Sequence, residues 1–317
     1  MKFAGVLAAA LSLVGRHGTL VAAASIFVGL SVPGLAAVCK PYLGEAIVVM
    51  LMLAFLRVDP DELFHHFTRP GLIGAATAWA MLVVPVALGL TFMIFGLNQR
   101  MPGLYFMLVL QMSAPGLMSS PALAALLGLD VALTLASLIV STAITPMTAS
   151  LFTYAFLGTA LPSPFGFGIR LFLIIAGCAI AAAIIRFVTG RSFIEAQRER
   201  IDGLSVLAMF MFAVAAMDGV ADHFRDNPLL VIELTALAFA LALGMIALTV
   251  LVFLRVGRAR AFAIGLIAGN RNIGLMLAAT GFAVPDIAWL YFAVAQFPIY
   301  LLPHLLKPLA RRLQQSA

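Results

Sequence analysis

The most constraining feature of this chain is a series of uninterrupted apolar runs, each about twenty residues long. Hydrophobic residues make up 63% of the 317 residues, and charged residues make up only 10%. A soluble core of this size does not need so much apolar sequence. A membrane β-barrel would show alternating polar and apolar positions instead of continuous runs. The sequence therefore predicts an all-α polytopic membrane protein.

Charged, proline and glycine positions divide the apolar runs into ten expected spans. The spans are residues 18–36, 41–57, 71–92, 104–128, 131–157, 168–187, 203–221, 228–252, 261–282 and 286–304. Residues 1–17 combine a lysine near the start with a short apolar run, so we expect an interfacial helix there. Asp130 precedes the fifth span, and we expect it to cap that helix.

The basic residues give an independent test of the span count, because cytoplasmic loops are enriched in Lys and Arg. With ten spans, fourteen of the 19 basic residues fall on one side, four fall on the other, and Arg271 lies within a span. The fourteen are Lys2, Arg16, Arg57, Arg69, Arg186, Arg191, Arg198, Arg200, Arg255, Arg258, Arg260, Lys307, Arg311 and Arg312; the four are Lys40, Arg100, Arg170 and Arg225. We therefore expect both termini in the cytoplasm and the chain in the inner (plasma) membrane. The net charge of +6 reflects this topology, and nucleic acid is not an expected partner.

Arg271 lies in the middle of the expected ninth span, between Asn270 and Asn272. A guanidinium keeps its proton in proteins, and at the bilayer centre it costs at least about 3 kcal/mol. It therefore needs an anion, a cavity or a dipole to face. We interpret the position as a substrate site, in which the planar fork of Arg271 binds an organic anion. An ion pair with a carboxylate, from Glu45 or Glu233, is the alternative.

The expected fourth span contains a second polar break. Its prolines each remove a helical hydrogen bond, and its serines can satisfy freed backbone groups or bind a ligand. We expect the helix breaks at Pro115, Gly116, Pro121 and Gly269. The candidate substrate-binding residues are Arg271, Asn270, Asn272, Ser113, Ser119, Ser120, Gln111 and Gln296. The amides among them could instead form helix–helix hydrogen bonds.

An internal repeat relates the two halves of the chain at an offset of 159 residues. In one pair of spans Gly44, Met50, Met52, Ala54 and Asp59 fall on Gly203, Met209, Met211, Ala213 and Asp218. The same offset places Ser113 on Asn272, which aligns the two polar breaks. Each half holds five spans, so the halves must have opposite orientations. Two inverted five-helix repeats, each with one broken helix, are typical of secondary transporters.

Motifs along nearly all of the chain resemble those of the bile acid/sodium symporter family. The most recognisable segment runs from 114–116 through 128–133 to 145–146, and residues 269–275 resemble the family's second crossover. The resemblance implies a panel domain (18–57 and 165–221) and a core domain (70–157 and 227–305), with broken helices four and nine crossing in the core. It also implies transport of organic anions, either small carboxylates or bile-acid-like molecules, by alternating access and usually with sodium.

The positions that the resemblance assigns to sodium are altered in this chain. The residues found there are Ser120, Pro121, Thr134, Leu138, Ile267, Arg271 and Ala80. Of the expected ligands, only the hydroxyls of Ser120 and Thr134 remain, and the intramembrane glutamate has become Ile267. Sodium requires several oxygen ligands. We therefore predict sodium-independent transport, in which Arg271 supplies the charge that sodium supplies in relatives. Proton coupling and exchange stay open, and no cofactor or metal is expected.

Two other functions are compatible with this pattern. An ordinary sodium symporter could rebuild an ion site from Ser119, Ser120, Thr134 and backbone carbonyls. A sensor of the same fold would bind a ligand without moving it. A channel is disfavoured by the broken helices, and the chain carries none of the HExxH or GxSxG motifs of membrane enzymes.

Overall fold

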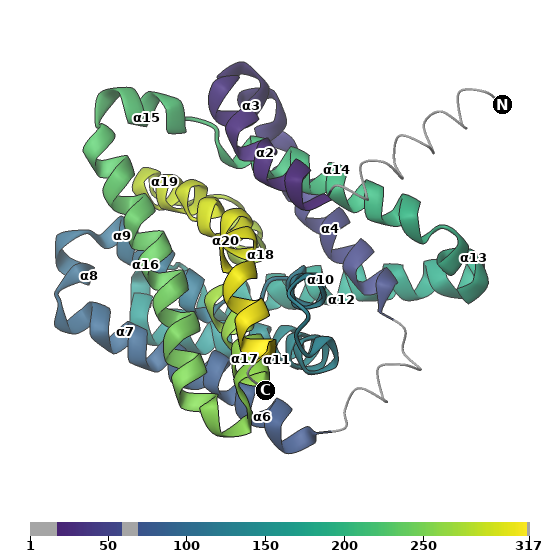
Figure 1. Ribbon diagram of the computed structural model, residues 1–317. Helices are drawn as coiled ribbons and strands as arrows, with labels where there is room; N and C mark the ends of the chain where they lie inside the picture. Colours follow the sequence, from purple (N-terminus) through teal and green to yellow (C-terminus); the bar gives the residue numbers. More distant parts are fainter. Residues whose placement is uncertain (1–17, 59–68, 316–317) are drawn as a thin grey trace. The chain divides into compact units, whose positions relative to one another are not determined.

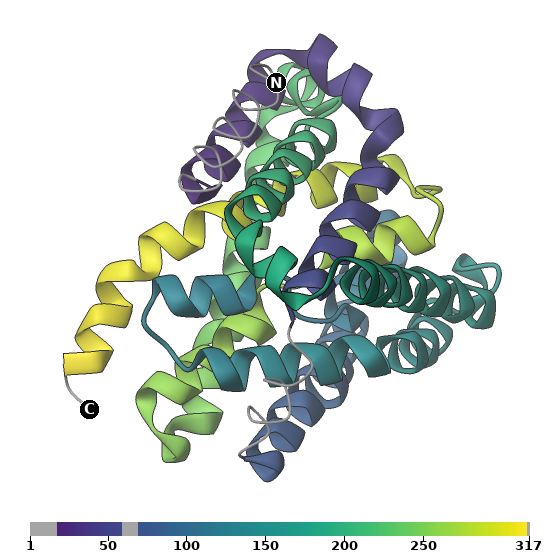
Figure 2. The ribbon, with the colours of Figure 1, turned by 90° about the vertical axis from the view of Figure 1, so that its right-hand side faces the viewer.

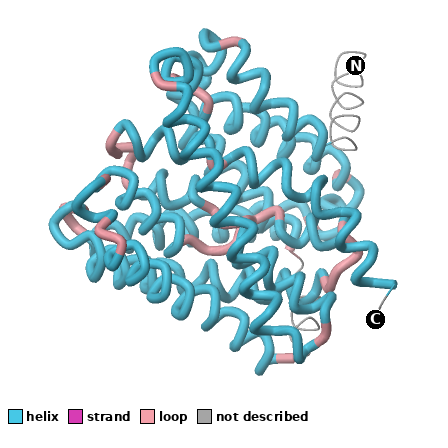
Figure 3. Tube along the Cα trace, turned by 60° about the vertical axis from the view of Figure 1, so that its left-hand side comes forward, coloured by secondary structure: helices cyan, strands magenta, loops and turns pink. Residues whose placement is uncertain are grey.

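The computed structural model describes residues 18–58 and 69–315. Within these ranges the chain consists of helices joined by short loops (Figure 3), and β pairing is limited to one isolated bridge between Gly116 and Arg271. The expected all-α class is thus confirmed for the described chain. The interfacial helix expected at residues 1–17 lies outside the described residues.

Seven helical segments of the described chain are long and apolar enough to cross a membrane. They are Pro33–Arg57, Pro70–Ile94, Val131–Ala160, Pro164–Thr189, Arg198–Asp226, Pro228–Val256 and Asp286–Pro308. Large apolar side chains on these segments face outward; Phe187 is 91% exposed and Ile94 is 82% exposed. Such exposure is costly in water and natural in lipid. These helices indicate a membrane-embedded protein with several spans.

The remaining three expected spans fall on shorter helices. Residues 18–36 contain α2 (Gly18–Ser31) and the start of α3 (Pro33–Cys39); residues 104–128 contain most of α9 (Pro102–Ser113), and α10 (Ser120–Leu126); residues 261–282 contain most of α17 (Arg258–Gly269), and α18 (Ile273–Ala279). The boundary between the first two spans lies earlier in the chain than expected. Pro33 disfavours a helical conformation at Val32, which has φ −126° and ψ 72°. After it the chain stays helical through η1 (Lys40–Tyr42) and α4 (Leu43–Arg57).

The chain forms two compact units. Of the described residues, the first unit contains 18–58 and 174–232, and the second contains 69–173 and 233–315. Helices α12 (Pro164–Thr189) and α16 (Pro228–Phe253) each contribute to both units. The panel range that starts at residue 165 therefore begins earlier than the matching part of the first unit, and the panel and core roles stay a prediction.

In the first unit, α14 (Arg198–Ala216) packs along α2, α3 and α4 (Figures 1 and 2). Gly29 of α2 permits a close approach, because a Cβ at this position would lie 2.9 Å from the Cβ of Met217. Two ion pairs also form in this unit. Arg57 of α4 pairs with Asp202 of α14 at 3.1 Å, and Lys40, between α3 and α4, pairs with Asp218, just after α14, at 2.8 Å.

In the second unit, α17 is a central helix, buried from Ala261 to Gly269. One face packs through Ile264 against α6 (Pro70–Ala78) and α11 (Val131–Leu157). Residues of its other faces pack with α10, α16 and α20 (Gln296–Gln315). Because α17 is surrounded in this way, the residues that follow it, Asn270 and Arg271, lie deep inside the second unit.

Helix α11 of the same unit begins where the sequence analysis expected. The Asp130 side chain accepts a hydrogen bond from the Leu133 N–H at 2.9 Å. This is the geometry of an N-cap, so the capping role predicted for Asp130 is confirmed.

Candidate functional site

The first helix break separates α9 from α10 at residues 114–119. Pro115 has no backbone N–H, and Ala114 before it is extended, with φ −72° and ψ 150°. A following proline favours that conformation. Gly116 also lies in the break. The helix resumes at Ser120, with Pro121 in its first turn, where a proline removes no helical hydrogen bond. The helix break expected at Pro121 is therefore wrong, because this proline starts the helix and does not interrupt it.

The second break separates α17 from α18 at residues 270–272 and contains no proline. Helix α17 ends at Gly269, and Asn270 is extended, with φ −107° and ψ 103°. Asn272 then starts α18, because its side-chain Oδ1 accepts the Leu275 N–H at 3.1 Å. Asparagine is among the preferred N-cap residues. This break is therefore produced by capping, whereas the first is produced by proline.

The two breaks are hydrogen-bonded to each other. Bonds of 2.9 Å run from the Leu117 N–H to the Asn270 oxygen and from the Asn272 N–H to the Pro115 oxygen. Breaking a helix leaves backbone groups without partners, and burying such groups unpaired is costly. The bridge pairs four of them, two from each break, so each break stabilises the other.

Gly116 and Arg271 lie opposite each other in this bridge. They form its non-hydrogen-bonded pair, the kind in which Cα atoms approach to about 4.5 Å. A Cβ at Gly116 would lie only 2.6 Å from the Cγ2 atom of Ile267, so this position needs glycine. Gly269 is similarly confined, since a Cβ there would lie 2.7 Å from the Ala242 carbonyl oxygen.

The Arg271 side chain is 3% exposed and is held by backbone carbonyls. Its Nε donates to the Ala268 oxygen at 2.8 Å, its Nη1 to the Ala114 oxygen at 2.8 Å, and its Nη2 to the Ala80 oxygen at 2.9 Å. The Met81 sulfur lies 3.8 Å from Nη1. Hydrogen bonds from a charged donor contribute about 1.5–3 kcal/mol each. The guanidinium thus links the two breaks to a third segment.

Two of the three carbonyls belong to helix ends. Ala268 lies in the last turn of α17, where carbonyls have no intrahelical donor. The N–H four residues on, that of Asn272, bonds to Pro115 instead. Ala114 directly follows the last residue of α9. Both oxygens therefore need a donor from outside their helices, and Arg271 supplies it.

The third carbonyl, that of Ala80, is freed by a π-helical segment, η2 (Trp79–Val83). Within it the Val84 N–H bonds to the Trp79 carbonyl, five residues back. The next residue is Pro85, which has no N–H. Neither Val84 nor Pro85, the residues four and five positions after Ala80, therefore donates to the Ala80 carbonyl. The guanidinium therefore occupies a cage of three backbone oxygens, those of Ala80, Ala114 and Ala268, which we call the carbonyl cage.

No carboxylate among the described residues pairs with Arg271. Glu233, which belongs to the same unit, is exposed, and Glu45 belongs to the other unit. Ion pairing with Glu233 is thus not what neutralises the buried charge; the carbonyl dipoles do so. In this conformation the fork of donors faces the carbonyl cage, so direct binding of an anion by Arg271 stays a prediction.

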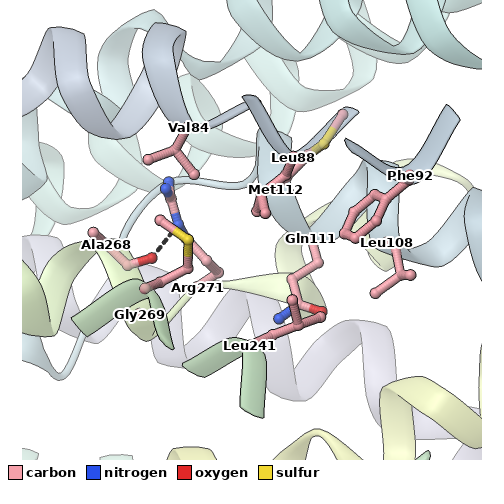
Figure 4. Close-up of a pocket in the computed structure, with 11 residues that line it drawn as sticks. Val84, Leu88, Phe92, Leu108, Gln111, Met112, Leu241, Ala268, Gly269 and Arg271 are labelled. Carbon is pink, nitrogen blue, oxygen red and sulfur yellow. Dashed lines mark hydrogen bonds between the residues drawn. The ribbon is translucent and has the colours of Figure 1, made fainter. Parts of the chain in front are cut away.

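A cavity of about 20 Å³ adjoins Arg271 (Figure 4). Such a volume is about what one water molecule needs. Arg271 and Ala268 lie at one end of the cavity in Figure 4, and Phe92 and Leu108 lie at the other, with Gln111 as the second polar residue. The remaining apolar lining comes from α7 (Val84–Ile94), α9 and α16, through Val84, Leu88, Met112, Leu241 and Met245. In this conformation the cavity is too small for an organic anion.

Two of the other candidate residues donate to backbone carbonyls four residues earlier in the chain. The Thr134 hydroxyl donates to the Asp130 carbonyl at 2.7 Å, and the Gln296 amide donates to the Phe292 carbonyl at 2.9 Å. Ser119 immediately precedes α10 but forms no side-chain cap. These three residues are not brought to the carbonyl cage by any contact of their side chains.

Three other candidates contrast with these. The Oγ atoms of Ser113 and Ser120 and the Oδ1 atom of Asn270 are buried and have no partner among the described residues. Asn270 lies in the second break, and Ser113 and Ser120 are the helical residues that flank the first. Buried polar atoms are usually hydrogen-bonded in proteins, so unpartnered ones at a break are suited to bind a polar ligand.

The sequence analysis missed the cage residues Ala80, Ala114 and Ala268 as partners of Arg271. Their functional atoms are backbone oxygens, so the residue type carries no signal. Pro85 did carry one, because a proline inside a helix frees a carbonyl four or five residues earlier. That rule points to the carbonyls of Met81 and Ala80, and the Ala80 carbonyl is the one that accepts from the guanidinium.

Comparison of the chain with protein-family models gives no match, and comparison with curated proteins gives none. The resemblance to the bile acid/sodium symporter family therefore depends on the sequence motifs alone and stays a prediction.

Proposed function

We propose that this chain is a secondary transporter of organic anions, related in design to the bile acid/sodium symporters. The observation that supports this most strongly is the bridge between two helix breaks around buried Arg271. A broken backbone at membrane depth is tolerated only where protein or a watery cavity covers it. An ionisable group at such a break marks a functional site by default. Paired breaks of this kind serve substrate and ion binding in secondary transporters.

The proposed topology has ten spans in two inverted halves of five. It adds α2 and the two interrupted pairs, α9 with α10 and α17 with α18, to the seven long helices. The interrupted pairs are then the fourth and ninth spans. Both termini lie in the cytoplasm, the first unit acts as the panel, and the second acts as the core. Alternating access follows from movement of one unit against the other.

The charge of Arg271 selects an anion even while its donors are engaged with carbonyls. At an effective dielectric constant of about 20, a unit charge attracts a carboxylate about 8 Å away by about 2 kcal/mol. The unpartnered hydroxyls of Ser113 and Ser120 can donate short-range hydrogen bonds to the anion. The Nδ2 of Asn270, by contrast, already donates to the Leu266 carbonyl. Substrates of this proposal are small carboxylates or bile-acid-like anions.

Transport is proposed to be independent of sodium. The fixed charge of Arg271 already occupies the break, and a sodium ion nearby would be repelled by it. Ile267 and Leu138 offer no side-chain oxygen, and the Thr134 hydroxyl is engaged with Asp130. The driving force is then exchange, a proton gradient or the substrate gradient itself.

The test is uptake of radiolabelled small carboxylates and bile acids by the purified chain in liposomes, with and without a sodium gradient. We expect uptake that does not respond to sodium, with counterflow when unlabelled substrate is loaded inside. Arg271→Gln should abolish uptake, and the matched control Arg225→Gln, at an exposed position, should preserve it. Uptake driven by a sodium gradient would identify an ordinary symporter instead. Binding by thermal shift with no uptake would identify a sensor.

A further inference from the structure

The carbonyl cage has the composition of a cation site. Its three oxygens all point at one group, and each comes from a place where a helix has lost its own donor. No carboxylate among the described residues completes it. Without a cation, three carbonyl dipoles would face one another in a buried space, each at the cost of an unmade hydrogen bond.

The atoms that line the carbonyl cage also limit which cation fits it. Alkali metal ions take five or more hard oxygen ligands, as in carbonyl-lined filters. The cage has three oxygens and, as its fourth group, the Met81 sulfur, which is a soft and poor ligand for such ions. Three separated acceptors instead match a planar group with N–H donors on three sides.

We infer that the carbonyl cage is a binding site for a guanidinium-type cation, and that Arg271 is its tethered occupant. Removing the side chain leaves a site that takes a free guanidinium ion in preference to sodium or potassium. The adjoining cavity gives the guest additional room. This inference goes beyond the proposed transport function, because it concerns what holds the two breaks and η2 together and not what crosses the membrane.

The experiment compares wild type with Arg271→Ala in detergent, with added guanidinium chloride. Stability is followed by thermal unfolding and by size-exclusion profiles of the fluorescently tagged chain in membrane extracts. We expect the unfolding temperature of the variant to rise saturably with low millimolar guanidinium, far below denaturing concentrations. Wild type should not respond, because its cage is filled. Choline and sodium chloride at equal ionic strength should have no such effect.

A matched control is Arg186→Ala in the first unit. Arg186 also donates to two carbonyls at a helix end, those of Leu56 and Val58, but it is only half-buried. Equal rescue of both variants would mean a general effect on helix ends and would overturn the inference. Equal stabilisation of Arg271→Ala by sodium would overturn the proposed selectivity. If the variant yields no monodisperse peak, a peak restored by guanidinium supports the inference, and none with or without it contradicts it.

Discussion

The two helix breaks of the second unit have similar architecture and opposite chemistry. The first, between α9 and α10, leaves six residues outside the helices, contains Pro115, and supplies acceptors: the carbonyls of Ala114 and Pro115. The second, between α17 and α18, leaves three residues, contains no proline, and supplies the main donor, Arg271. Each break is incomplete without the other.

The contrast teaches how a broken helix can be kept in an apolar environment. A break made by proline is fixed by covalent structure, because the N–H is absent whatever the surroundings. A break made by capping depends on the partners that replace the helical bonds. Arg271 is a permanent cation in the second break, and it satisfies freed carbonyls of both breaks.

Neutralising Arg271 should have the largest effect on stability. Arg271→Met keeps an extended apolar side chain but leaves three buried carbonyls without a donor. Leaving a buried hydrogen-bonding group unsatisfied typically costs about 1–3 kcal/mol, so the loss of the donor to three carbonyls should cost about 3 kcal/mol or more. We expect a loss of that size, measured by thermal unfolding in detergent. Arg271→Lys, which keeps the charge with a different donor geometry, should fall between Met and wild type. A Met variant as stable as wild type would show that the guanidinium does not hold the breaks.

A side chain at Gly116 should have the next largest effect. In Gly116→Ala the new Cβ would meet Ile267 at 2.6 Å, and overpacking of this kind costs about 1–3 kcal/mol. Ile267→Ala should relieve the clash, so that the double variant is more stable than the sum of the single costs. Gly74→Ala in α6 is the matched control, since a Cβ there meets nothing within 4 Å. Additive effects of the two changes at the bridge would contradict the close approach.

The positions of the breaks follow from local sequence, and for that reason they were predictable. Pro115 removes an N–H whatever its tertiary setting, and Asn272 is a short polar residue suited to begin a helix, as Asp130 does for α11. The error at the first span has the same local origin. Pro33 ends the helical run at Val32, whereas the end of the first span was expected near residue 36.

The partners of Arg271 were not predictable in this way. The expected partners were a carboxylate or a ligand, because the type of a residue identifies only its side-chain groups. The groups that contact it are backbone oxygens of three alanines, up to 191 positions away along the chain. Only the packing of α9, α17 and η2 brings them together, and packing of distant helices is not encoded in any local motif.

Restoring the N–H that Pro85 lacks tests whether its absence frees the Ala80 carbonyl in η2. In Pro85→Ala the new donor can reach the Ala80 carbonyl, which Arg271 otherwise satisfies. We therefore expect coupling of about 1 kcal/mol in a double-mutant cycle with Arg271→Met, with Pro85→Ala more favourable in the Met background. Pro146→Ala in α11 is the control and should show no coupling, because the carbonyl four residues before Pro146 is that of Thr142, to which Arg271 does not donate. Equal coupling for both prolines would contradict the origin assigned to the freed carbonyl.

The smallest effect on stability is expected for the serines of the first break, and it separates ligand binding from folding. Ser113→Ala and Ser120→Ala remove hydroxyls with no partner among the described residues, so stability should stay within about 0.5 kcal/mol of wild type. Thr134→Val removes a hydroxyl that donates to Asp130, and it should cost about 1 kcal/mol. If the serine hydroxyls contact the transported anion, liposome uptake falls in both serine variants although their unfolding temperatures do not change. A serine variant that loses stability with its uptake would instead assign the hydroxyl to the fold, and unchanged uptake in both would remove the serines from the substrate site.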